Sequence, residues 1–381
     1  MMKKVMFLAI LLLGSIGGRA EEASSGLTSA LPDWIKSIEI HSFLSLGYVY
    51  NFNDPDSDIN TQRFFDFKHD QFRVDDFQLS ILNPVEEPGD AGFRVDFDAG
   101  SNIPDVIQSA GLFDDPDGED IDLRQAFVSY NAPLGNGLTI DFGKYITHFG
   151  LEVIEGWPGF NDNYSHSYDF SFAIPFTHTG VRLSYPLSDQ FSLMLMAVNG
   201  WDKVDDNNDT KAVGGQIGFF PMEDVSIYFN YIGSPEQDDN DDDWRHLFGV
   251  TWVAKPFATA LPDLTFSGTY DYGTEANVGA DGGNAEWHAA EAVLRYDFTS
   301  KFYLAVRADV MADEDGARIT PGISQTVWAF TVTPTFLLTE NLVVRPEFRY
   351  DQSDEDVFED DDGTFTEDSQ TTIGVNAIYY F

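Results

Sequence analysis

Residues 371–381 read TTIGVNAIYYF, and this stretch decides the fold. At a period of two, one face is apolar and consists of Ile373, Val375, Ala377, Tyr379 and Phe381. The opposite face is polar except for Ile378. This alternation is typical of a β-strand with one apolar and one polar side. About eleven residues of a tilted strand just span the hydrocarbon of a bilayer. The stretch predicts a membrane strand, and the alternative is an edge strand of a soluble sheet.

The first twenty residues, MMKKVMFLAILLLGSIGGRA, have the pattern of a secretory signal peptide. Lys3 and Lys4 precede a short apolar run, and small residues follow it up to Ala20. The run is too short and wrongly flanked for a membrane helix. We expect cleavage after Ala20, or alternatively after Ala23. The chain therefore divides into a signal peptide (1–20), a short leader (21–36) and a single barrel domain (37–381).

The rest of the sequence excludes most other architectures. No other stretch approaches about 18 consecutive apolar residues, so membrane-spanning helices are not expected. The chain contains no Cys, so no disulfide framework supports the fold. An exported chain of this kind is either a soluble protein or a closed β-barrel in the outer membrane.

The composition is strongly acidic and also rich in aromatic residues. The formal charge is −43, from 21 basic and 64 acidic residues. Without Lys3, Lys4 and Arg19, 18 basic residues stand against 64 acidic ones, a charge of −46. Such a surface repels nucleic acid, so no nucleic-acid partner is expected. A hydrophobic content of 43% and an aromatic content of 15% argue against disorder.

From residue 38 onward, strand-like runs alternate with connections, and we count about sixteen strands. An even number is typical of a bacterial single-chain barrel. The predicted ranges are 38–51, 71–82, 91–98, 121–131, 137–146, 175–185, 190–199, 211–220, 224–233, 244–255, 263–272, 286–297, 301–310, 323–335, 341–351 and 371–381.

Charges placed between apolar neighbours indicate which face of these strands is wet. In the run 301–310, Arg307 and Asp309 alternate with Val306, Ala308 and Val310. Exposing a charge at such a position to lipid is energetically unfavourable, so the charge should point into a water-filled lumen. A soluble sandwich would show the same alternation with its apolar face in the core. The number of strands and of aromatic residues favours an all-β, up-and-down antiparallel transmembrane barrel.

The connections differ in length in a regular way. Short connections such as NAPLGNG, YPLSD, PMED, FTS and LLTEN alternate with long ones that are mostly acidic. The acidic examples are DPDSDINTQRFFDFKHD, GLFDDPDGED, SPEQDDNDDD and DQSDEDVFEDDDGTFTEDSQ. Outer-membrane barrels have short periplasmic turns and long external loops. If the N-terminus is periplasmic, every long loop falls outside and Phe381 returns to the periplasm.

The segment 121–201 carries a family resemblance. It contains FVSY, GLT, GK and T.FG.E, then N.NYS.SY.F..A.P..HTGVR..YPL, and finally VNGW. This pattern resembles the OmpL-like β-barrel porin family over about eighty residues, and the remainder of the chain resembles it only in strand rhythm. The resemblance implies an outer-membrane barrel with pore activity and transfers no catalytic or ligand residues. Phe381 resembles the last aromatic residue of such barrels, which the barrel-assembly machinery reads.

The loop of residues 147–174 is the third long connection, and it is the candidate constriction. An aromatic-rich loop has a physical reason to fold inward rather than remain in water. Its carboxylates are Glu152, Glu155, Asp162 and Asp169. The basic wall residues that could face them are Arg94, Arg182, Arg295, Arg307, Arg345 and Arg349. Opposed carboxylates and guanidinium groups would set a transverse field across the pore. The alternative is an external lid packed on the rim.

The acidic runs DPDSDIN, DDNNDTK, DDPDGED and DDDGTFTED are similar to calcium loops, in which Asp oxygens recur at alternate positions. None has the full spacing, with Gly at the sixth position and a bidentate Glu at the twelfth. Weak Ca²⁺ binding is one interpretation. The alternatives are a solvated charge run, or diffuse binding of divalent cations that bridge lipopolysaccharide. No other cofactor is expected.

An enzymatic site is not expected. A hydrolase would need Ser and His, or Asp and His, brought together at the outer rim. His148, Ser165, His166 and His178 lie close in sequence, but seven His and abundant Ser make this coincidence unremarkable.

The sequence therefore predicts a bacterial outer-membrane porin that admits small hydrophilic solutes or ions by passive diffusion, with a weak preference for cations. The expected partners are outer-membrane lipid and lipopolysaccharide, with a homotrimer as one assembly. The alternative function is a non-conducting structural or surface-interaction barrel.

Overall fold

The computed structural model describes residues 37–103, 121–256 and 259–381. The predicted signal peptide, the leader and the acidic run DDPDGED lie outside the described residues. The elements are β1 (Glu39–Asn51), β2 (Gln71–Asn83), β3 (Ala91–Ala99), β4 (Ile121–Ala132), β5 (Leu138–Ile146), the π-helix η3 (Asp169–Ala173), β6 (Thr177–Ser188), β7 (Phe191–Val198), β8 (Ala212–Met222), β9 (Val225–Pro235), β10 (Trp244–Ala254), β11 (Leu264–Glu275), β12 (Ala285–Thr299), β13 (Phe302–Asp313), β14 (Gln325–Leu337), β15 (Leu342–Ser353), β16 (Phe358–Glu359), β17 (Phe365–Glu367) and β18 (Ser369–Tyr380).

Sixteen of the described strands form a closed barrel, in which β1 pairs with β2 on one side and with β18 on the other. Every other strand pairs with its neighbours in the chain, except that β18 follows β15 and the two-stranded sheet of β16 and β17 stands apart. The predicted all-β barrel is confirmed, and each predicted strand end lies within three residues of the observed one. Closure matters because a sheet edge left open in lipid would carry unsatisfied backbone groups.

The last strand closes the barrel against the first. Antiparallel pairing runs from Phe43 opposite Tyr380 to Asn51 opposite Thr372. Ser42 and Phe381 then exchange both backbone hydrogen bonds, each 3.1 Å from N to O. The terminal aromatic residue is therefore held by main-chain bonds while its side chain is 43% exposed.

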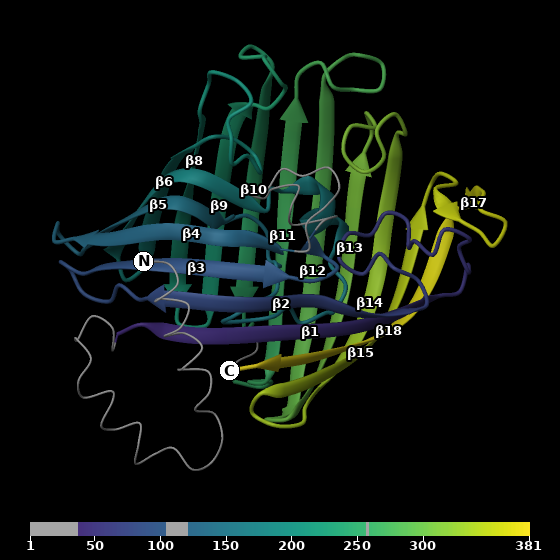
Figure 1. The fold of residues 1–381 in the computed structure, drawn as a ribbon, viewed down its shortest axis with the longest axis horizontal. Helices are drawn as coiled ribbons and strands as arrows, with labels where there is room; N and C mark the ends of the chain where they lie inside the picture. The colour runs from purple at the N-terminus through teal and green to yellow at the C-terminus, as the bar shows by residue number, and fades with distance from the viewer. Residues whose placement is uncertain (1–36, 104–120, 257–258) are drawn as a thin grey trace, which may run out of the picture.

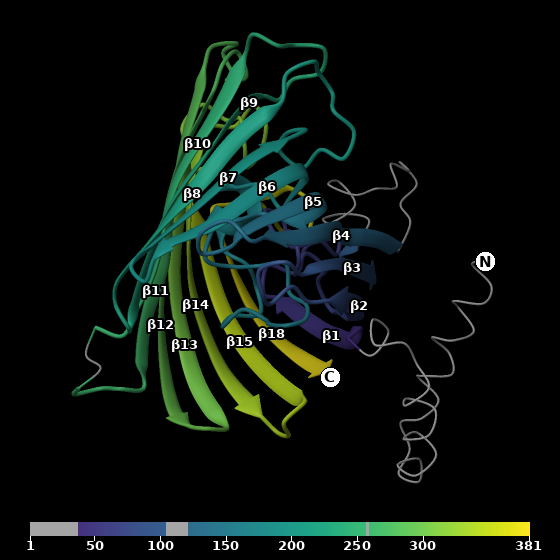
Figure 2. The ribbon, with the colours of Figure 1, turned by 90° about the vertical axis from the view of Figure 1, so that its left-hand side faces the viewer.

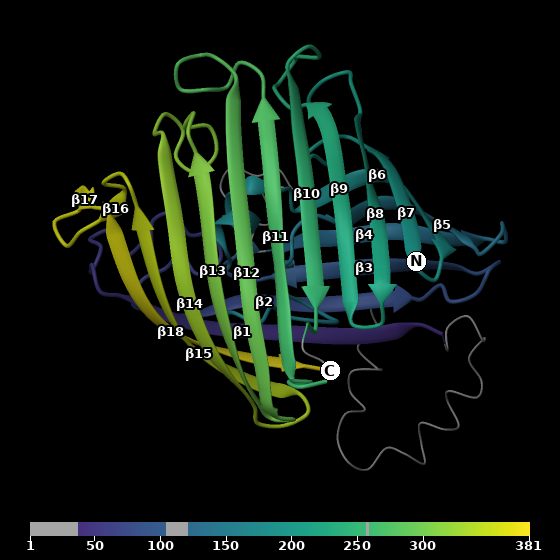
Figure 3. The same cartoon turned by 180° about the vertical axis from the view of Figure 1, so that it is seen from behind.

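The strands tilt strongly, as closure of a sixteen-stranded sheet requires. In Figure 1, β1 to β5 run nearly horizontally in front of β10 to β14, which stand nearly upright behind them. Figure 3 shows the upright wall from the other side, and Figure 2 shows it edge-on with β1 to β6 facing it. The two walls enclose the lumen between them.

The period of two sorts side chains between the outside and the lumen. Phe348, Ile373 and Tyr379 are among the exposed apolar residues of the outer face. Arg307 and Asn376 belong to the inner face and are fully buried. Apolar groups therefore cover the outside and polar groups line the inside, the reverse of a water-soluble barrel.

The two ends of the barrel differ. Connections at one end, including 84–90, 133–137 and 338–341, are short, and this end also holds the start of β1 and the end of β18. The opposite end carries the long connections. We call them the short-turn end and the long-loop end. Among the described residues, no helix is both long and apolar enough to cross a bilayer.

Candidate pore constriction

The connection between β5 and β6, residues 147–176, folds into the lumen, and we call it the lumen loop. It begins and ends at the long-loop end, where the Thr147 amide donates to the Phe176 carbonyl at 2.9 Å. Its side chains Phe149, Tyr168 and Phe170 are buried in one apolar cluster with wall residues of the barrel. Burial of these aromatic rings supplies the driving force for the inward course.

The tip of the lumen loop reaches the short-turn end. The Trp157 indole stacks on His41 of β1, with 3.7 Å between ring centroids and 7° between planes. Arg94 lies over the same indole, 5.5 Å from its centroid. Phe160 packs near Tyr380 of β18, with ring centroids 6.1 Å apart. The loop therefore runs along the lumen from one end of the barrel to the other.

Three carboxylates of the lumen loop bind arginines of β12, β13 and β15. Glu152 Oε1 lies 2.6 Å from Arg307 Nη1, and Asp162 Oδ1 lies 2.8 Å from Arg295 Nη1. Glu155 accepts two hydrogen bonds from Arg345, at 2.7 and 2.9 Å. Bidentate pairing of this kind is both strong and geometrically specific. Burial by itself would raise the pKa of Glu152, but Arg307 and the Ser167 hydrogen bonds hold it below its usual value.

Wall carboxylates also grip the backbone of the lumen loop. Glu347 of β15 accepts the amides of Tyr164 and Ser165, at 2.7 and 3.0 Å. Asp309 of β13 accepts the amide of Tyr168 at 3.0 Å. The strand period of two places both acids on the inner face but does not indicate this role. What it could not indicate was that loop amides, rather than solutes or arginines alone, would be their partners.

A glycine on the first strand makes room for the loop. A Cβ on Gly47 of β1 would lie 2.0 Å from the Tyr164 hydroxyl oxygen and 2.3 Å from an oxygen of Asp75. The Tyr164 hydroxyl donates to Asp75 Oδ2 at 2.9 Å. The wall at this position is therefore shaped to receive the loop.

Three of the predicted wall arginines do not meet loop carboxylates, which corrects the sequence prediction. Arg182 pairs with Asp141 on the adjacent strand at 2.8 Å, and Arg349 pairs with Asp351 at 2.7 Å. Arg94 pairs with Asp96 at 2.9 Å, although it also donates to the Trp157 carbonyl at 2.7 Å. Each of these arginines lies beside a carboxylate two residues away on its own strand or directly opposite on the adjacent strand, and these carboxylates are closer to it than those of the lumen loop.

Asp169 does not meet a wall arginine, which corrects its expected pairing. This residue begins η3, is fully buried, and faces Asp271 of β11 and Glu291 of β12 instead of an arginine. Burial, and then the neighbouring acids Asp271 and Glu291, raise the pKa of Asp169 well above its usual value. The cause is the turn of η3, which directs this side chain to the β11–β12 wall, away from the arginines of β13 and β15.

Two further buried arginines, one in the first long loop and one on β4, were not predicted from the sequence. Arg63 is buried between Asp66 of its own loop and Asp351 of β15. On the opposite wall, Arg124 is buried beside Asp76 and lies 2.8 Å from Asp98. Arg63 lies in a loop without strand period, so only its tertiary contacts show that it faces the lumen.

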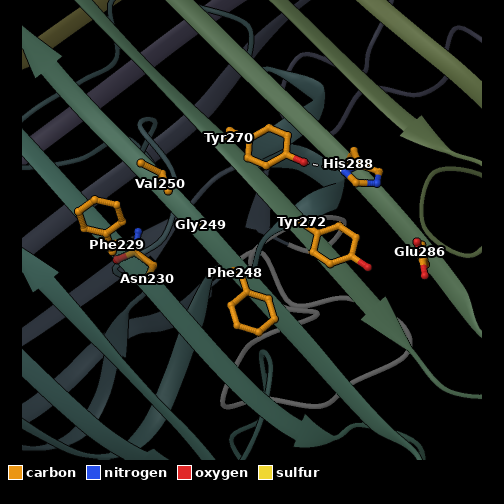
Figure 4. A pocket seen from close by; sticks show the side chains of 9 residues that line it. All are labelled: Phe229, Asn230, Phe248, Gly249, Val250, Tyr270, Tyr272, Glu286 and His288. Carbon is orange, nitrogen blue, oxygen red and sulfur yellow. Dashed lines mark hydrogen bonds between the residues drawn. The ribbon is translucent and has the colours of Figure 1, made fainter.

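Several hollows accompany this arrangement. A cavity of about 260 Å³ lies between the lumen loop and strands β11 and β12, and a smaller one of about 100 Å³ lies at the loop base. A larger groove of about 500 Å³ lies over β9 to β12, where Phe229, Phe248 and Tyr270 are exposed. Figure 4 shows its side chains, with the Tyr270 hydroxyl 2.7 Å from His288 Nδ1. This groove belongs to the apolar outer face.

Comparison with known families identifies the chain. The family model described as beta-barrel porin-2, OmpL-like, matches residues 37–381. The chain belongs to this porin family. It is an outer-membrane β-barrel protein, as the predicted localisation stated.

Solved structures agree on the fold of this porin-family chain. The outer membrane channel DcaP of Acinetobacter baumannii is 15% identical, with a TM-score of 0.59 over 90% of this chain and 97% of its own. The anion-selective porin from Comamonas acidovorans is 10% identical, with a TM-score of 0.61 over 90% and 99%. OprB of Pseudomonas putida is 12% identical, with a TM-score of 0.60 over 92% and 96%. No curated protein sequence matches.

Family and fold point to a channel rather than an enzyme, and the side chains weighed for hydrolysis have other contacts. The Ser165 hydroxyl lies 3.3 Å from Arg307 Nη2. His166 Nε2 lies 3.0 Å from the Asn161 side chain, and its ring packs on Phe65 and Phe170. His178 lies 3.1 Å from the Thr147 hydroxyl. Ser165, His166 and His178 therefore support the loop and its base.

The acidic run 360–368 of this porin-family barrel forms a turn. Within the described residues, no group of three or more His, Asp or Glu side chains is placed to hold a metal ion. In the run 360–368, the Asp360 carboxylate accepts hydrogen bonds from the Thr364 amide and hydroxyl and from the Thr366 hydroxyl, at 2.7–2.9 Å. The Thr364 amide and the two hydroxyls lower the pKa of Asp360 to about 2. Hydrogen bonds therefore occupy this carboxylate.

Proposed function

We propose that this protein is a passive diffusion channel for small hydrophilic solutes, with a weak preference for cations, and that the lumen loop sets its throughput. The observation that carries the proposal is the pairing of Glu152, Glu155 and Asp162 with wall arginines across a polar lumen. Membership in a porin family supports it. The mechanism is size exclusion combined with the electrostatic field of the lumen and its mouth.

Exposure differs along the row of charged pairs. The side chain of Arg295 is 33% exposed and that of its partner Asp162 is 26% exposed. The side chains of Arg307, near the middle of β13, and of Arg345, the fourth residue of β15, are fully buried. Hydrated groups thus reach the inner surface at the Asp162–Arg295 pair, whereas the barrel is closed around the loop at the Arg307 and Arg345 pairs. Permeation through the centre would require displacement of the loop, so its attachment should govern the current.

The proposed cation preference comes from the long-loop end. The mature chain carries 18 basic residues against 64 acidic ones, and several dense acidic runs lie in long loops. A negative mouth concentrates cations over a Debye length, roughly 8 Å at physiological salt. Wall arginines oppose this field locally, but each of those named above has a carboxylate partner.

The second candidate function is a non-conducting surface or structural barrel. It is favoured by one observation, the complete pairing and burial of Arg307, Arg345 and Arg349 in the lumen. A plugged barrel would pair its inner charges in this way. The two functions differ in whether the lumen loop ever leaves its place.

Planar-bilayer recording of the full mature chain tests the proposal. We expect discrete conductance steps, and we expect deletion of residues 150–170 to increase their size because the loop no longer fills the lumen. Conductance in neither protein would support the non-conducting barrel. Equal steps in both would remove the role assigned to the lumen loop.

The proposed partners are outer-membrane lipid and lipopolysaccharide on the apolar outer face, and the barrel-assembly machinery at Phe381. Exposure of the Phe381 side chain at the closing seam supports the second of these. A homotrimer is a further proposal, and one solved neighbour, OmpT of Vibrio cholerae, is described as a trimer form. Weak Ca²⁺ binding at the acidic loops stays a prediction.

A further inference from the structure

Three acidic side chains beneath the lumen loop have no basic partner. Asp169 of the loop, Asp271 of β11 and Glu291 of β12 are each at most 2% exposed. Among the described residues, no salt bridge reaches any of them, and the nearby Arg307 is bound to Glu152 and Asp309. Carboxylates buried without a partner are costly, so this cluster must take up protons or a cation.

Glu291 is the member of the cluster that lacks hydrogen-bond donors and also lines a cavity. Its Oε1 is buried and has no hydrogen-bond partner. Its Oε2 lies 3.1 Å from the Ser167 hydroxyl, but that hydroxyl lies only 2.7 Å from Glu152 Oε2. A hydroxyl has one proton to donate, and the shorter contact assigns it to Glu152. Glu291 Oε1 is therefore a buried carboxylate oxygen without a hydrogen-bond donor among the described residues.

The cavity beside Glu291 has the lining of a site for a small amphipathic cation. Its volume is about 260 Å³, below the range of roughly 300–1,000 Å³ typical of drug-sized ligands. Its charged lining residues, Glu152, Asp162 and Glu291, are all acidic. Leu151, Val153 and Val293 supply an apolar wall. Of the three lining carboxylates, Glu291 is the one without a salt bridge among the described residues, since Arg307 pairs with Glu152 and Arg295 with Asp162.

We propose that this cavity binds a small organic cation, a primary ammonium group on a short apolar body. The ammonium would donate to Glu291 Oε1, and the apolar body would lie against Leu151, Val153 and Val293. An ammonium group has three donors and no acceptor, which suits a carboxylate without donors. A metal ion fits less well, because the described residues contain no metal-binding group and half of this wall is apolar.

The water-accessible edge of the cavity is on the Asp162 side. Asp162 and Arg295 are partly exposed there, whereas Glu291 lies at the buried end. A cation entering along Asp162 would therefore pass from a neutralised pair toward the unneutralised acid. As a statement about which solutes permeate, this inference rests on the proposed channel function, whereas binding itself can be measured without any current.

Isothermal titration of the full mature chain in detergent, with benzylamine as the probe, tests the site. We expect saturable binding that weakens by at least about tenfold in Glu291→Gln, because a hydrogen bond to a charged group is lost. The matched control is Glu286→Gln, since Glu286 lies on the exposed face of the same strand and should leave binding unchanged. Benzyl alcohol, which has nearly the same shape and no charge, should not bind measurably.

A second variant tests the cavity without changing any of the three acidic residues. Ser267→Leu narrows the cavity from β11 without touching a carboxylate, and it should also weaken benzylamine binding. The proposal is overturned if benzylamine does not bind, which would mean that protons neutralise the cluster. It is equally overturned if Glu291→Gln binds as well as the original chain. Benzylamine binding by a chain that shows no conductance would refute the proposed channel but not the binding site. Conductance by a chain that does not bind benzylamine would refute the binding site but not the channel.

Discussion

Loss of the Arg345 contacts should release the lumen loop. Arg345 is fully buried and donates two hydrogen bonds to Glu155, at 2.7 and 2.9 Å, and two to the carbonyls of Asn161 and Asn163, at 2.8 and 3.1 Å. In Arg345→Gln the Glu155 carboxylate loses its counter-ion. Breaking a buried pair in this way costs about 3–5 kcal/mol.

That free energy predicts a large change in gating. The lost free energy destabilises the docked loop and not the strand pairing. A loss of about 3–4 kcal/mol corresponds to a fall of roughly 10²- to 10³-fold in the ratio of docked to released loop. In single-channel recording, Arg345→Gln should show longer or larger open states than the original chain. Arg345→Lys keeps the charge but cannot form the two-pronged contact, so it should be intermediate.

The matched control is Arg182→Gln. Arg182 also faces the lumen and binds a carboxylate, but its partner Asp141 belongs to the wall and not to the loop. It should change ion selectivity slightly and leave gating alone. Identical gating of Arg345→Gln and the original chain, with protease access showing that the loop had been freed, would refute the claim that loop docking controls the current.

Three further outcomes follow from particular contacts. Trp157→Ala removes the stack on His41 and the contact with Arg94, each worth about 0.5–1.5 kcal/mol, so limited proteolysis should cut the loop tip faster, while His41→Phe, which retains stacking, should not show this. Reversal potentials in a KCl gradient should show a preference for cations that shrinks as total salt rises, because the acidic mouth is screened; a preference for anions at low salt would instead assign control to the wall arginines. The pKa of Asp360, about 2 in the folded chain, lies below its usual value, so the turn at 360–368 should be fully stabilised above about pH 4 and should lose that contribution as pH falls toward 2; in Thr366→Val the pKa of Asp360 measured by NMR should rise, and an unchanged pKa would contradict the assigned cause.

The strands could be predicted from the sequence because each strand has one face toward lipid and the other toward the polar lumen. Lipid outside and a polar interior impose a strict alternation, so Val306 and Arg307 already reveal opposite sides without any knowledge of their neighbours. Even the exception was visible: Ile378, the apolar residue on the polar face, is fully buried beside Phe43 and Val343. Loop lengths likewise separated the two ends before any contact was known.

Partners within the lumen were only half predictable. The wall arginines could be assigned to the inner face by strand alternation, and the loop carboxylates Glu152, Glu155 and Asp162 do pair with Arg307, Arg345 and Arg295. Nothing in the alternation, however, distinguished these arginines from Arg182 or Arg349, which pair within the wall. Pairing depends on how far along each strand a residue sits and on where the loop crosses it, and both are properties of the closed barrel.

What the sequence by itself determined was therefore the barrel: the number of strands, their facing, the closing strand ending at Phe381, and the identity of the loop able to enter. Those features follow from local periodicity and composition. Only the tertiary structure decided how deep the loop goes, that Trp157 reaches His41 at the far end, and that Asp169 meets Asp271 and Glu291. A loop has no repeating pattern of apolar and polar residues, so its sequence does not show which way each side chain faces. Its contacts are set by shape and charge across the lumen, where residues more than a hundred positions apart come together.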